Sequence, residues 1–219
     1  MTAFVLKYRL IKTPSDPVEF DLWLKAFLDG MQGKAKASDT PKKAEEQYGV
    51  SVSELAANDG RQAVKYIRSR ADKWGIAPDR IGMIGFSAGA YITFATVMDN
   101  DPDGRLDFAA VIYGGVIEGR NPPGDAPPLV LVVAQDDQWT FTGCQKLYTE
   151  WNTAKRPVEF HSFAQGGHGF GMLKQGLPVD HWSDLFAYWL DSLGLMKRGD
   201  TPHKSSMFEV PKPSANGKR

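Results

Sequence analysis

The chain has 219 residues, which is enough for one large domain with a substantial core. Lysine plus arginine and aspartate plus glutamate number 26 each, so the formal net charge is zero and nothing favours nucleic acid or an anionic membrane as a partner. No apolar run approaches the roughly 18 residues that a membrane span needs, and the N-terminus lacks the pattern of a signal peptide, so we expect a cytoplasmic protein unless the natural start lies upstream.

The first third of the chain predicts a strand, two helices and a loop. Residues 3–8 (AFVLKY) form a short apolar run that is typical of a buried strand. Residues 18–31 place apolar side chains at helical spacing, with Gly30 as a stop signal. The segment 34–50 is polar and charged, which indicates a loop, and the spacing over 52–74 predicts one long amphipathic helix.

From residue 80 onward, predicted strands and helices alternate. The predicted strands cover 80–85, 108–113, 129–134 and 158–163, and the predicted helices cover 88–98, 142–155 and 180–193. Two of these strands, FAAVIY and LVLVVA, are apolar throughout, as in parallel strands that are covered on both faces. This order predicts an α/β fold, a mostly parallel sheet with helices on both faces. We expect a single domain over 1–198 and a loosely ordered tail over 199–219.

One serine stands where a predicted strand gives way to a predicted helix, in the stretch Gly85-Phe86-Ser87-Ala88-Gly89. This pattern is typical of a nucleophile elbow, a sharp strand-to-helix turn with serine at its apex and small neighbours that let strand and helix approach. The alternative is a tight turn in which serine has no chemical role. The N–H of Ala88, at the start of the helix, is a candidate donor to an oxyanion.

A serine hydroxyl needs a base, and His168 is the best placed of the four histidines. It lies in the stretch QGGHGFG between a predicted strand and a helix, where four glycines let the backbone turn freely; a purely structural loop would also explain them. Asp136 and Asp137 follow the strand LVLVVA, and one of them could orient His168. The order serine, aspartate, histidine is that of α/β hydrolases.

Together these segments resemble the α/β-hydrolase superfamily, and more closely its acetyl-xylan-esterase-like and dienelactone-hydrolase-like branch. The resemblance runs from Ala3 to about Leu195 and rests on AFVLKYRL, RSRADKWGIAPDRIGMIGFSAGA, LVVAQDD, AKRPVEFHSFAQGGHGFG and WSDLFAYWL. It implies Asp137 as the acid, with Asp136 as the alternative. Dienelactone hydrolases have a cysteine at the position of Ser87, so the resemblance implies ester chemistry here.

Relatives in this branch have further strands and a glycine-rich oxyanion loop before the segment that resembles residues 3–8. Nothing in this chain matches that loop, so we expect an N-terminally shortened sheet with an exposed edge. A homodimer or the helix Phe20–Met31 is expected to cover this edge.

The sequence thus predicts a serine esterase that forms an acyl-enzyme on small, acetyl-type esters, without metal or organic cofactor. The alternatives are a non-catalytic binding or assembly protein of the same fold and a peptidase of the same fold. Candidate substrate contacts follow strand ends, although each aromatic would serve equally well in a core: Tyr113, Gly114, Trp139, Phe141 and Phe170. The single cysteine, Cys144, excludes an internal disulfide and is expected to be a small packed residue.

Overall fold

The computed structural model describes residues 1–10, 12–31, 52–115 and 121–196. The chain divides into two compact units, Met1–Trp182 and Ser183–Arg219. The predicted loop over 34–50 and the predicted tail over 199–219 lie outside the described residues. The first unit contains the whole sheet and every residue of the candidate site.

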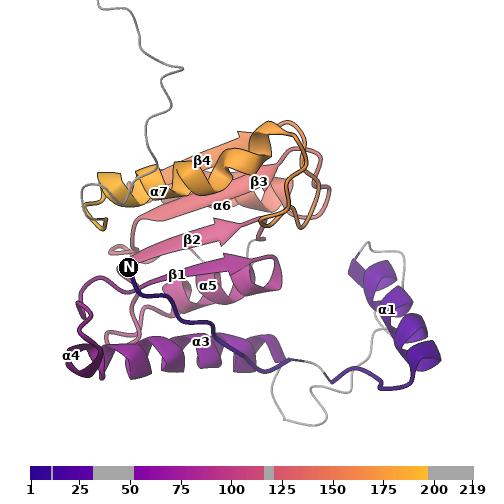
Figure 1. The fold of residues 1–219 in the computed structure, drawn as a ribbon, viewed down its shortest axis with the longest axis horizontal. Coiled ribbons are helices and arrows are strands. Elements are labelled where there is room, and N and C mark those ends of the chain that lie inside the picture. Colours follow the sequence, from indigo (N-terminus) through magenta and orange to yellow (C-terminus); the bar gives the residue numbers. More distant parts are fainter. Residues whose placement is uncertain (11, 32–51, 116–120, 197–219) are drawn as a thin grey trace, which may run out of the picture. The chain divides into compact units, whose positions relative to one another are not determined.

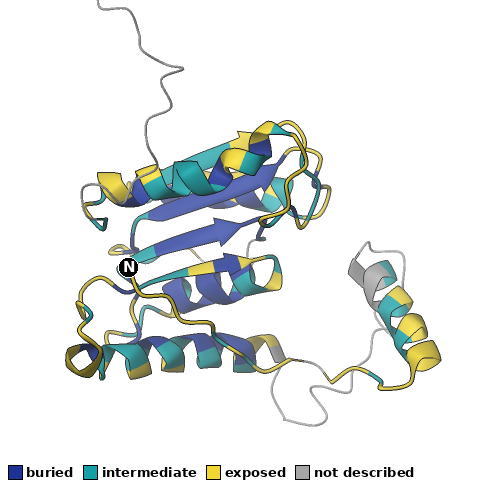
Figure 2. Cartoon of the chain, viewed as in Figure 1, coloured by how far each residue is buried: buried dark blue, intermediate teal, exposed yellow. Residues whose placement is uncertain are grey.

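Four parallel strands form one sheet in the order β1-β2-β3-β4 (Figure 1). The strands are β1 (Gly82–Phe86), β2 (Phe108–Ile112), β3 (Leu129–Ala134) and β4 (Val158–Phe163). The two central strands are the most deeply buried part of the molecule (Figure 2), as their unbroken apolar sequences predict. Because all four strands run the same way, the loops that follow them meet at one edge of the sheet.

Helices connect the strands, as parallel pairing requires. Helix α5 (Ala88–Asp99) contacts β1 and β2, α3 (Val52–Arg68) packs on α5, and α6 (Phe141–Thr153) contacts β3 and β4. Side chains from these helices and from the sheet form one core, which includes Val64, Phe94, Val111, Leu131, Leu147 and Trp151. The α/β fold and the parallel sheet are therefore confirmed.

The prediction of a strand over residues 3–8 is wrong. Residues 1–10 form no helix or strand; they run beside α3 and α4 (Ala71–Trp74). The Phe4 ring lies 5.1 Å from the Trp74 ring, and Arg9 makes an ion pair with Asp59. A strand exists only where a neighbouring strand supplies hydrogen bonds, and no strand of the described sheet pairs with this segment.

The long helix expected over residues 52–74 is divided into α3 and α4. The backbone tightens at the break, where the N–H of Arg70 donates to the carbonyl of Ile67 at 3.1 Å. Arg68 ends α3 and donates to the carbonyls of Pro78, Asp103 and Arg105. These bonds hold the end of α3 against the segments that contain Pro78, Asp103 and Arg105, and apolar spacing does not predict them.

The remaining helices follow the predicted positions closely. Helix α1 spans Pro17–Met31, and the Asp16 carboxylate accepts the N–H groups of Val18 and Glu19 at its start. A 3₁₀ helix, η1, spans Pro178–His181, and α7 spans Trp182–Ser192. No helix in the described part of the chain is long and apolar enough to cross a bilayer.

Candidate active site

Ser87 occupies the turn between β1 and α5. Its φ and ψ angles are 50° and −113°, a conformation that residues other than glycine rarely adopt. The turn is fixed by backbone bonds: the N–H of Ser87 donates to Ile112 at 3.1 Å, and its carbonyl accepts the N–H of Ala90 at 3.0 Å. A strained backbone of this kind raises the free energy by about 1–3 kcal/mol and persists only where the surrounding structure holds it.

The two glycines of the elbow have different roles. A Cβ atom at Gly85 would clash with the backbone carbonyl of Gly89 and with the Thr93 hydroxyl, so the close approach of β1 to α5 requires glycine there. A Cβ atom at Gly89 would meet nothing within 4 Å. The prediction that the elbow needs small residues beside the serine is therefore confirmed for Gly85 and is wrong for Gly89.

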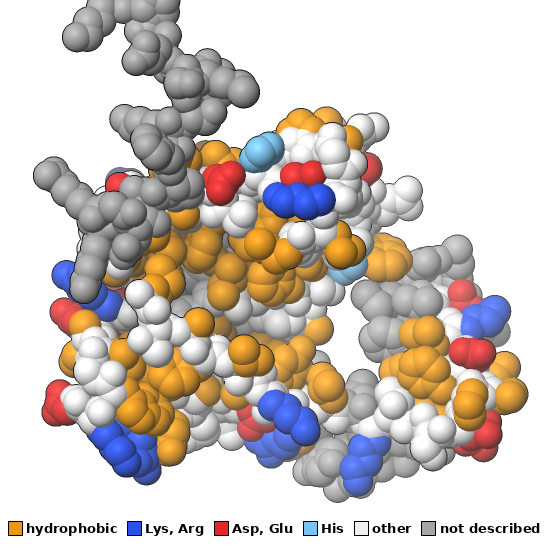
Figure 3. All heavy atoms as spheres, in the orientation of Figure 1, with side chains coloured by type: hydrophobic (Ala, Val, Ile, Leu, Met, Phe, Trp, Pro, Cys, Tyr) orange, Lys and Arg blue, Asp and Glu red, His pale blue; other side chains and the backbone are white. Residues whose placement is uncertain are grey.

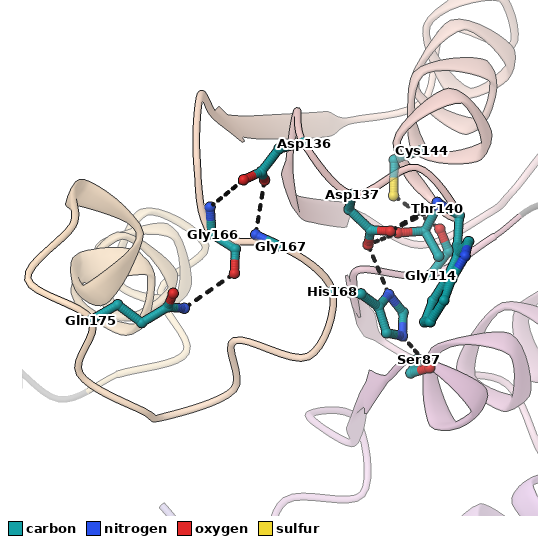
Figure 4. A network of polar contacts seen from close by, with 11 residues as sticks. Ser87, Gly114, Asp136, Asp137, Thr140, Cys144, Gly166, Gly167, His168 and Gln175 are labelled. Atoms are coloured by element: carbon teal, nitrogen blue, oxygen red, sulfur yellow. Dashed lines mark hydrogen bonds and ion pairs between the residues drawn. The ribbon is translucent and has the colours of Figure 1, made fainter.

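His168 reaches Ser87 from the loop that follows β4. The distance from its Nε2 to the Oγ of Ser87 is 2.8 Å (Figure 4). Gly167 and Gly169, on either side of the histidine, have φ angles of 66° and 83°, which favour glycine. The glycine-rich sequence thus allows a backbone path that turns the imidazole toward the serine.

Asp137 lies on the other side of the imidazole. Its Oδ2 is 2.8 Å from Nδ1 of His168, and the residue is only 1 % exposed. The same carboxylate accepts the Thr140 hydroxyl, and its Oδ1 accepts the N–H groups of Trp139 at 2.9 Å and Thr140 at 3.3 Å. Burial raises the pKa of Asp137, but these donors and His168 outweigh it and hold the pKa below its ordinary value of 3.8.

The protonation pattern follows from this environment. An ionised carboxylate only accepts hydrogen bonds, so Nδ1 of His168 carries the proton that it shares with Asp137. In a neutral ring the Nε2 is then an acceptor, and the Ser87 hydroxyl is its donor. The serine proton therefore points at the atom that could remove it.

Asp136 points away from the imidazole and holds the loop backbone. Its Oδ1 accepts the N–H of Gly167 at 2.8 Å, and its Oδ2 accepts the N–H of Gly166 at 3.3 Å. Figure 4 shows Asp136 bonded to Gly166 and Gly167, while Asp137 is bonded to the His168 ring. The structure thus gives the position next to His168 to Asp137.

Aromatic rings surround the imidazole. The ring centroids of Tyr113 and Trp139 lie 5.2 and 4.9 Å from that of His168, and Phe170 packs edge-on against Tyr113 at 4.6 Å. Tyr113 and Phe170 are buried, whereas Trp139 is 45 % exposed. Burial raises the pKa of the Tyr113 hydroxyl, a change that a backbone hydrogen bond from Gly171 partly offsets. Of these rings, Trp139 is the one that a molecule in solution could most readily touch.

The two other residues predicted to contact a substrate are Gly114 and Phe141. A Cβ at Gly114 would lie 2.6 Å from Ala90 and from Val111, so Gly114 permits close contact with α5. Its carbonyl accepts the S–H of buried Cys144 at 3.0 Å. Phe141 is the first residue of α6, and its N–H donates to the carbonyl of Asp137.

The sequence interpretation missed Thr140, Phe86 and Trp182. Thr140 follows Asp137 by three positions, a spacing at which an aspartate often binds backbone N–H groups of a turn. The Phe86 ring lies 5.9 Å from Tyr113 and 5.7 Å from Trp182, whose indole donates to the carbonyl of Gly171 at 2.7 Å. Only the Asp-x-x-Thr spacing is a signal that sequence alone could have supplied.

Ala88 begins α5, and its backbone N–H precedes the first intrahelical hydrogen bond, so the helix itself does not use it. The helix dipole adds positive potential at this point. Within the described ranges, no group of three or more His, Cys, Asp or Glu side chains is placed to hold a metal ion. The arrangement is therefore a serine, an imidazole and a carboxylate in line, beside an N–H donor.

One family model matches part of the chain. The family model BD-FAE matches residues 50–110, a span that includes α3, β1, Ser87 and α5. A comparison with curated proteins finds no match.

Several solved structures are similar to this chain. An acetyl ester-xyloside bifunctional hydrolase from Caldicellulosiruptor lactoaceticus is 24 % identical, with a TM-score of 0.58 over 65 % of this chain and 67 % of that chain. MGS-M1, an alpha/beta hydrolase enzyme from a Medee basin deep-sea metagenome library, is 26 % identical, with a TM-score of 0.55 over 64 % of each chain. A thermophilic esterase, Est2, from Thermogutta terrifontis is 20 % identical, with a TM-score of 0.58 over 71 % of this chain and 70 % of that chain.

The chain thus spans about two thirds of the length of these relatives. It has the α/β-hydrolase fold, and the resemblance to esterases and related hydrolases of that fold is confirmed.

Proposed function

We propose that this chain, which has the α/β-hydrolase fold, is a serine esterase that cleaves small carboxylic esters through an acyl-enzyme. The observation that carries the proposal is the continuous contact from Ser87 Oγ to His168 Nε2 and from His168 Nδ1 to Asp137, at 2.8 Å in each case. These distances lie within hydrogen-bond reach of a nucleophile, its base and the group that orients the base. The positive φ of Ser87 adds support, because strain of this kind clusters at functional sites.

In the first half of the proposed reaction, Ser87 Oγ attacks the ester carbonyl carbon while His168 Nε2 takes the hydroxyl proton. Asp137 holds the ring tautomer and stabilises the imidazolium that forms. His168 then gives the proton to the departing alkoxide oxygen, and the alcohol leaves. The acyl group remains bonded to Ser87.

In the second half, a water molecule attacks the acyl carbon and His168 takes its proton. The bond from carbon to Ser87 Oγ breaks, the proton returns to Ser87, and the carboxylic acid leaves. The N–H of Ala88 is the proposed donor to the oxyanion in both halves. A hydrolase of this class uses two such donors as a rule, and loss of one lowers turnover by about 10²–10³.

The proposed substrates have a short acyl chain, such as acetyl. The relatives support this size: one is an acetyl ester-xyloside hydrolase, and Est2 has been solved with propionate and with butyrate. In this chain the proposed acyl contacts are the rings nearest His168, those of Tyr113 and Trp139, with Phe170 behind Tyr113. Gly114 permits the close contact of its loop with α5, and a substrate contact at Phe141 stays a prediction.

A kinetic comparison tests the proposal. Wild type and Ser87→Ala are assayed with p-nitrophenyl acetate, butyrate and octanoate, and both are treated with a fluorophosphonate probe. The proposal expects turnover that depends on Ser87, faster with acetate and butyrate than with octanoate, and labelling of the wild type alone. Equal rates for the two proteins together with no labelling would instead favour a binding or assembly protein of the same fold.

A further inference from the structure

The loop that carries His168 has to span most of the sheet. Ser87 follows β1 and His168 follows β4, which are the two outer strands in the order β1-β2-β3-β4. Neighbouring strands lie about 4.8 Å apart, so β1 and β4 are about 14 Å apart, a distance that the loop and the imidazole bridge together. The path from the end of β4 to the histidine takes five residues, 164–168.

A glycine-rich loop does not hold such a path by itself. Glycine has more conformational freedom than any other residue, so Gly166 and Gly167 lose more backbone entropy when they are ordered. A catalytic base works only when it stays within hydrogen-bond reach of its nucleophile. Some other group must therefore fix the backbone that leads to His168.

Asp136 is the group that makes this contact. It follows β3, the strand that lies between the ends of the loop's path, and its carboxylate accepts the N–H groups of the two residues before His168. Bonds from N–H groups to a charged acceptor are stronger than bonds between neutral groups. Asp136 and Asp137 thus fix the same histidine from one strand end, the first through the backbone and the second through the ring.

A second set of bonds completes the support. The side-chain amide of Gln175 donates to the carbonyl of Gly166 at 3.1 Å (Figure 4), so both polar backbone groups of Gly166 are bonded. Gln175 is in turn held by Asp180, whose carboxylate accepts its N–H at 3.0 Å. The backbone contact nearest the imidazole is still that of Asp136 with Gly167.

We propose that Asp136 is a positioning residue, which keeps His168 in reach of Ser87 by holding the N–H groups of Gly166 and Gly167. This role rests on the proposed esterase function. It concerns a side chain that the sequence interpretation offered only as an alternative acid. Asp136 acts through the loop and makes no contact with the imidazole among the described hydrogen bonds.

Three substitutions separate loop anchoring from a simple effect of charge. Asp136→Asn keeps an acceptor oxygen and loses the charge, Asp136→Glu keeps the charge and moves the carboxylate by one methylene, and Asp136→Ala removes both. Anchoring predicts that kcat falls by about tenfold in the Ala and Glu variants, with KM within about twofold. Asn keeps an acceptor for only one of the two N–H groups, so its kcat should lie between those of wild type and Ala. A charge effect predicts the opposite order, with Glu near wild type and Asn equal to Ala.

The control is Asp72→Asn, which removes one exposed carboxylate from α4, outside the loop. It should leave kcat unchanged. The proposal is overturned if Asp136→Ala retains wild-type kcat, or if the Glu variant is active while Asn and Ala are equally impaired.

Amide hydrogen exchange gives a readout that does not depend on activity. In Asp136→Ala, a peptide that covers residues 164–171 should exchange about tenfold faster than in wild type, while a β3 peptide and the Asp72→Asn protein stay unchanged. Unchanged exchange in residues 164–171 also overturns the proposal. If the loop exchanges faster but wild type shows no turnover that depends on Ser87, the anchoring stands and the esterase function fails, so the two failures are distinguishable.

Discussion

The Oγ of Ser87 lies 2.8 Å from the Nε2 of His168, although 81 positions separate the two residues in the chain. One follows the first strand of the sheet and the other follows the last. The contact therefore depends on the whole sheet, and on the loop that crosses its carboxyl edge. This dependence makes substitutions at the elbow, the carboxylate and the loop informative in different ways.

Ser87 combines a proposed chemical role with a strained backbone, and two substitutions separate them. Ser87→Ala and Ser87→Gly should both abolish turnover with p-nitrophenyl acetate. Glycine tolerates the φ angle of 50°, whereas alanine keeps the strain, so Ser87→Gly should be about 1 kcal/mol more stable than Ser87→Ala. Urea unfolding of the two proteins checks this difference, and equal stability would mean that the elbow stores no strain.

Asp137 should affect both activity and the pH dependence of stability. Loss of the carboxylate that sets the His168 tautomer lowers turnover by about 10⁴-fold in a comparable triad, and a similar fall is expected for Asp137→Asn. Because the folded pKa of Asp137 lies below its unfolded value near 3.8, its contribution to stability is present above that value and is lost as the pH falls through the folded pKa. Urea unfolding at pH 7 and pH 3 should show wild type ahead of the variant by more at pH 7. A constant difference would contradict the lowered pKa.

The Thr140 hydroxyl should stabilise the ionised form of Asp137, since it donates to the same oxygen as His168. Thr140→Val leaves a buried carboxylate one donor short, which destabilises the fold by about 1–3 kcal/mol, while Thr140→Ser keeps the donor. The matched control is Thr149→Val, because the Thr149 hydroxyl donates only to the carbonyl of Gln145 on the exposed side of α6. Equal unfolding free energies for the two valine variants would contradict this role.

The two glycines of the elbow should respond in opposite ways to alanine. Gly85→Ala drives a methyl group into the backbone of Gly89 and should destabilise the fold by about 3 kcal/mol or more. Gly89→Ala meets open space in a helix and should stabilise by about 0.4–1 kcal/mol. Thermal unfolding of both variants, measured beside wild type, checks the prediction. A Gly89→Ala protein that unfolds earlier than wild type would show that the elbow needs both glycines.

We expect a second copy of the chain to cover β1, the outer strand of the described sheet, together with the sheet face opposite α5. Gly85 faces α5, so the alternation of the strand turns Ile84 and Phe86 to the opposite side, where they are 40 % and 37 % exposed. Hydrophobic side chains are visible at the surface around the position of β1 (Figure 3). Sedimentation should give a dimer for wild type and a monomer for Ile84→Lys. The control is Tyr66→Lys, a substitution at another exposed side chain, which should stay a dimer. A monomeric wild type would contradict this expectation.

Much of the sheet could be predicted from the sequence because its strands are local apolar runs. The strands over 129–134 and 158–163 have the predicted bounds, and the others agree within two residues at each end. The strand over 3–8 has the same apolar character and fails, because pairing depends on a neighbour and not on composition. The break between α3 and α4 was also not predicted from the apolar spacing over residues 52–74.

At the candidate site, the sequence supplied the residue types, and the fold decided their partners. Ser87, Asp137 and His168 could be proposed from motif and order, and the structure brings them together, while their catalytic roles stay predictions. The different tasks of Asp136 and Asp137 could not be predicted. The direction of each side chain depends on its partner in the loop after β4, which is Gly167 for Asp136 and His168 for Asp137. Thr140 is a different case, because its position three residues after Asp137 is a signal that the sequence contains.

The chain has one cysteine, Cys144, and its thiol is buried. Cys144 is fully buried, its S–H donates to the carbonyl of Gly114, and burial raises its pKa to about 12. A maleimide or a similar alkylating reagent should therefore modify the protein only when α6 separates from the loop after β2. The rate of alkylation becomes a direct kinetic record of how often this part of the molecule opens, with no label to introduce and no second thiol to mask.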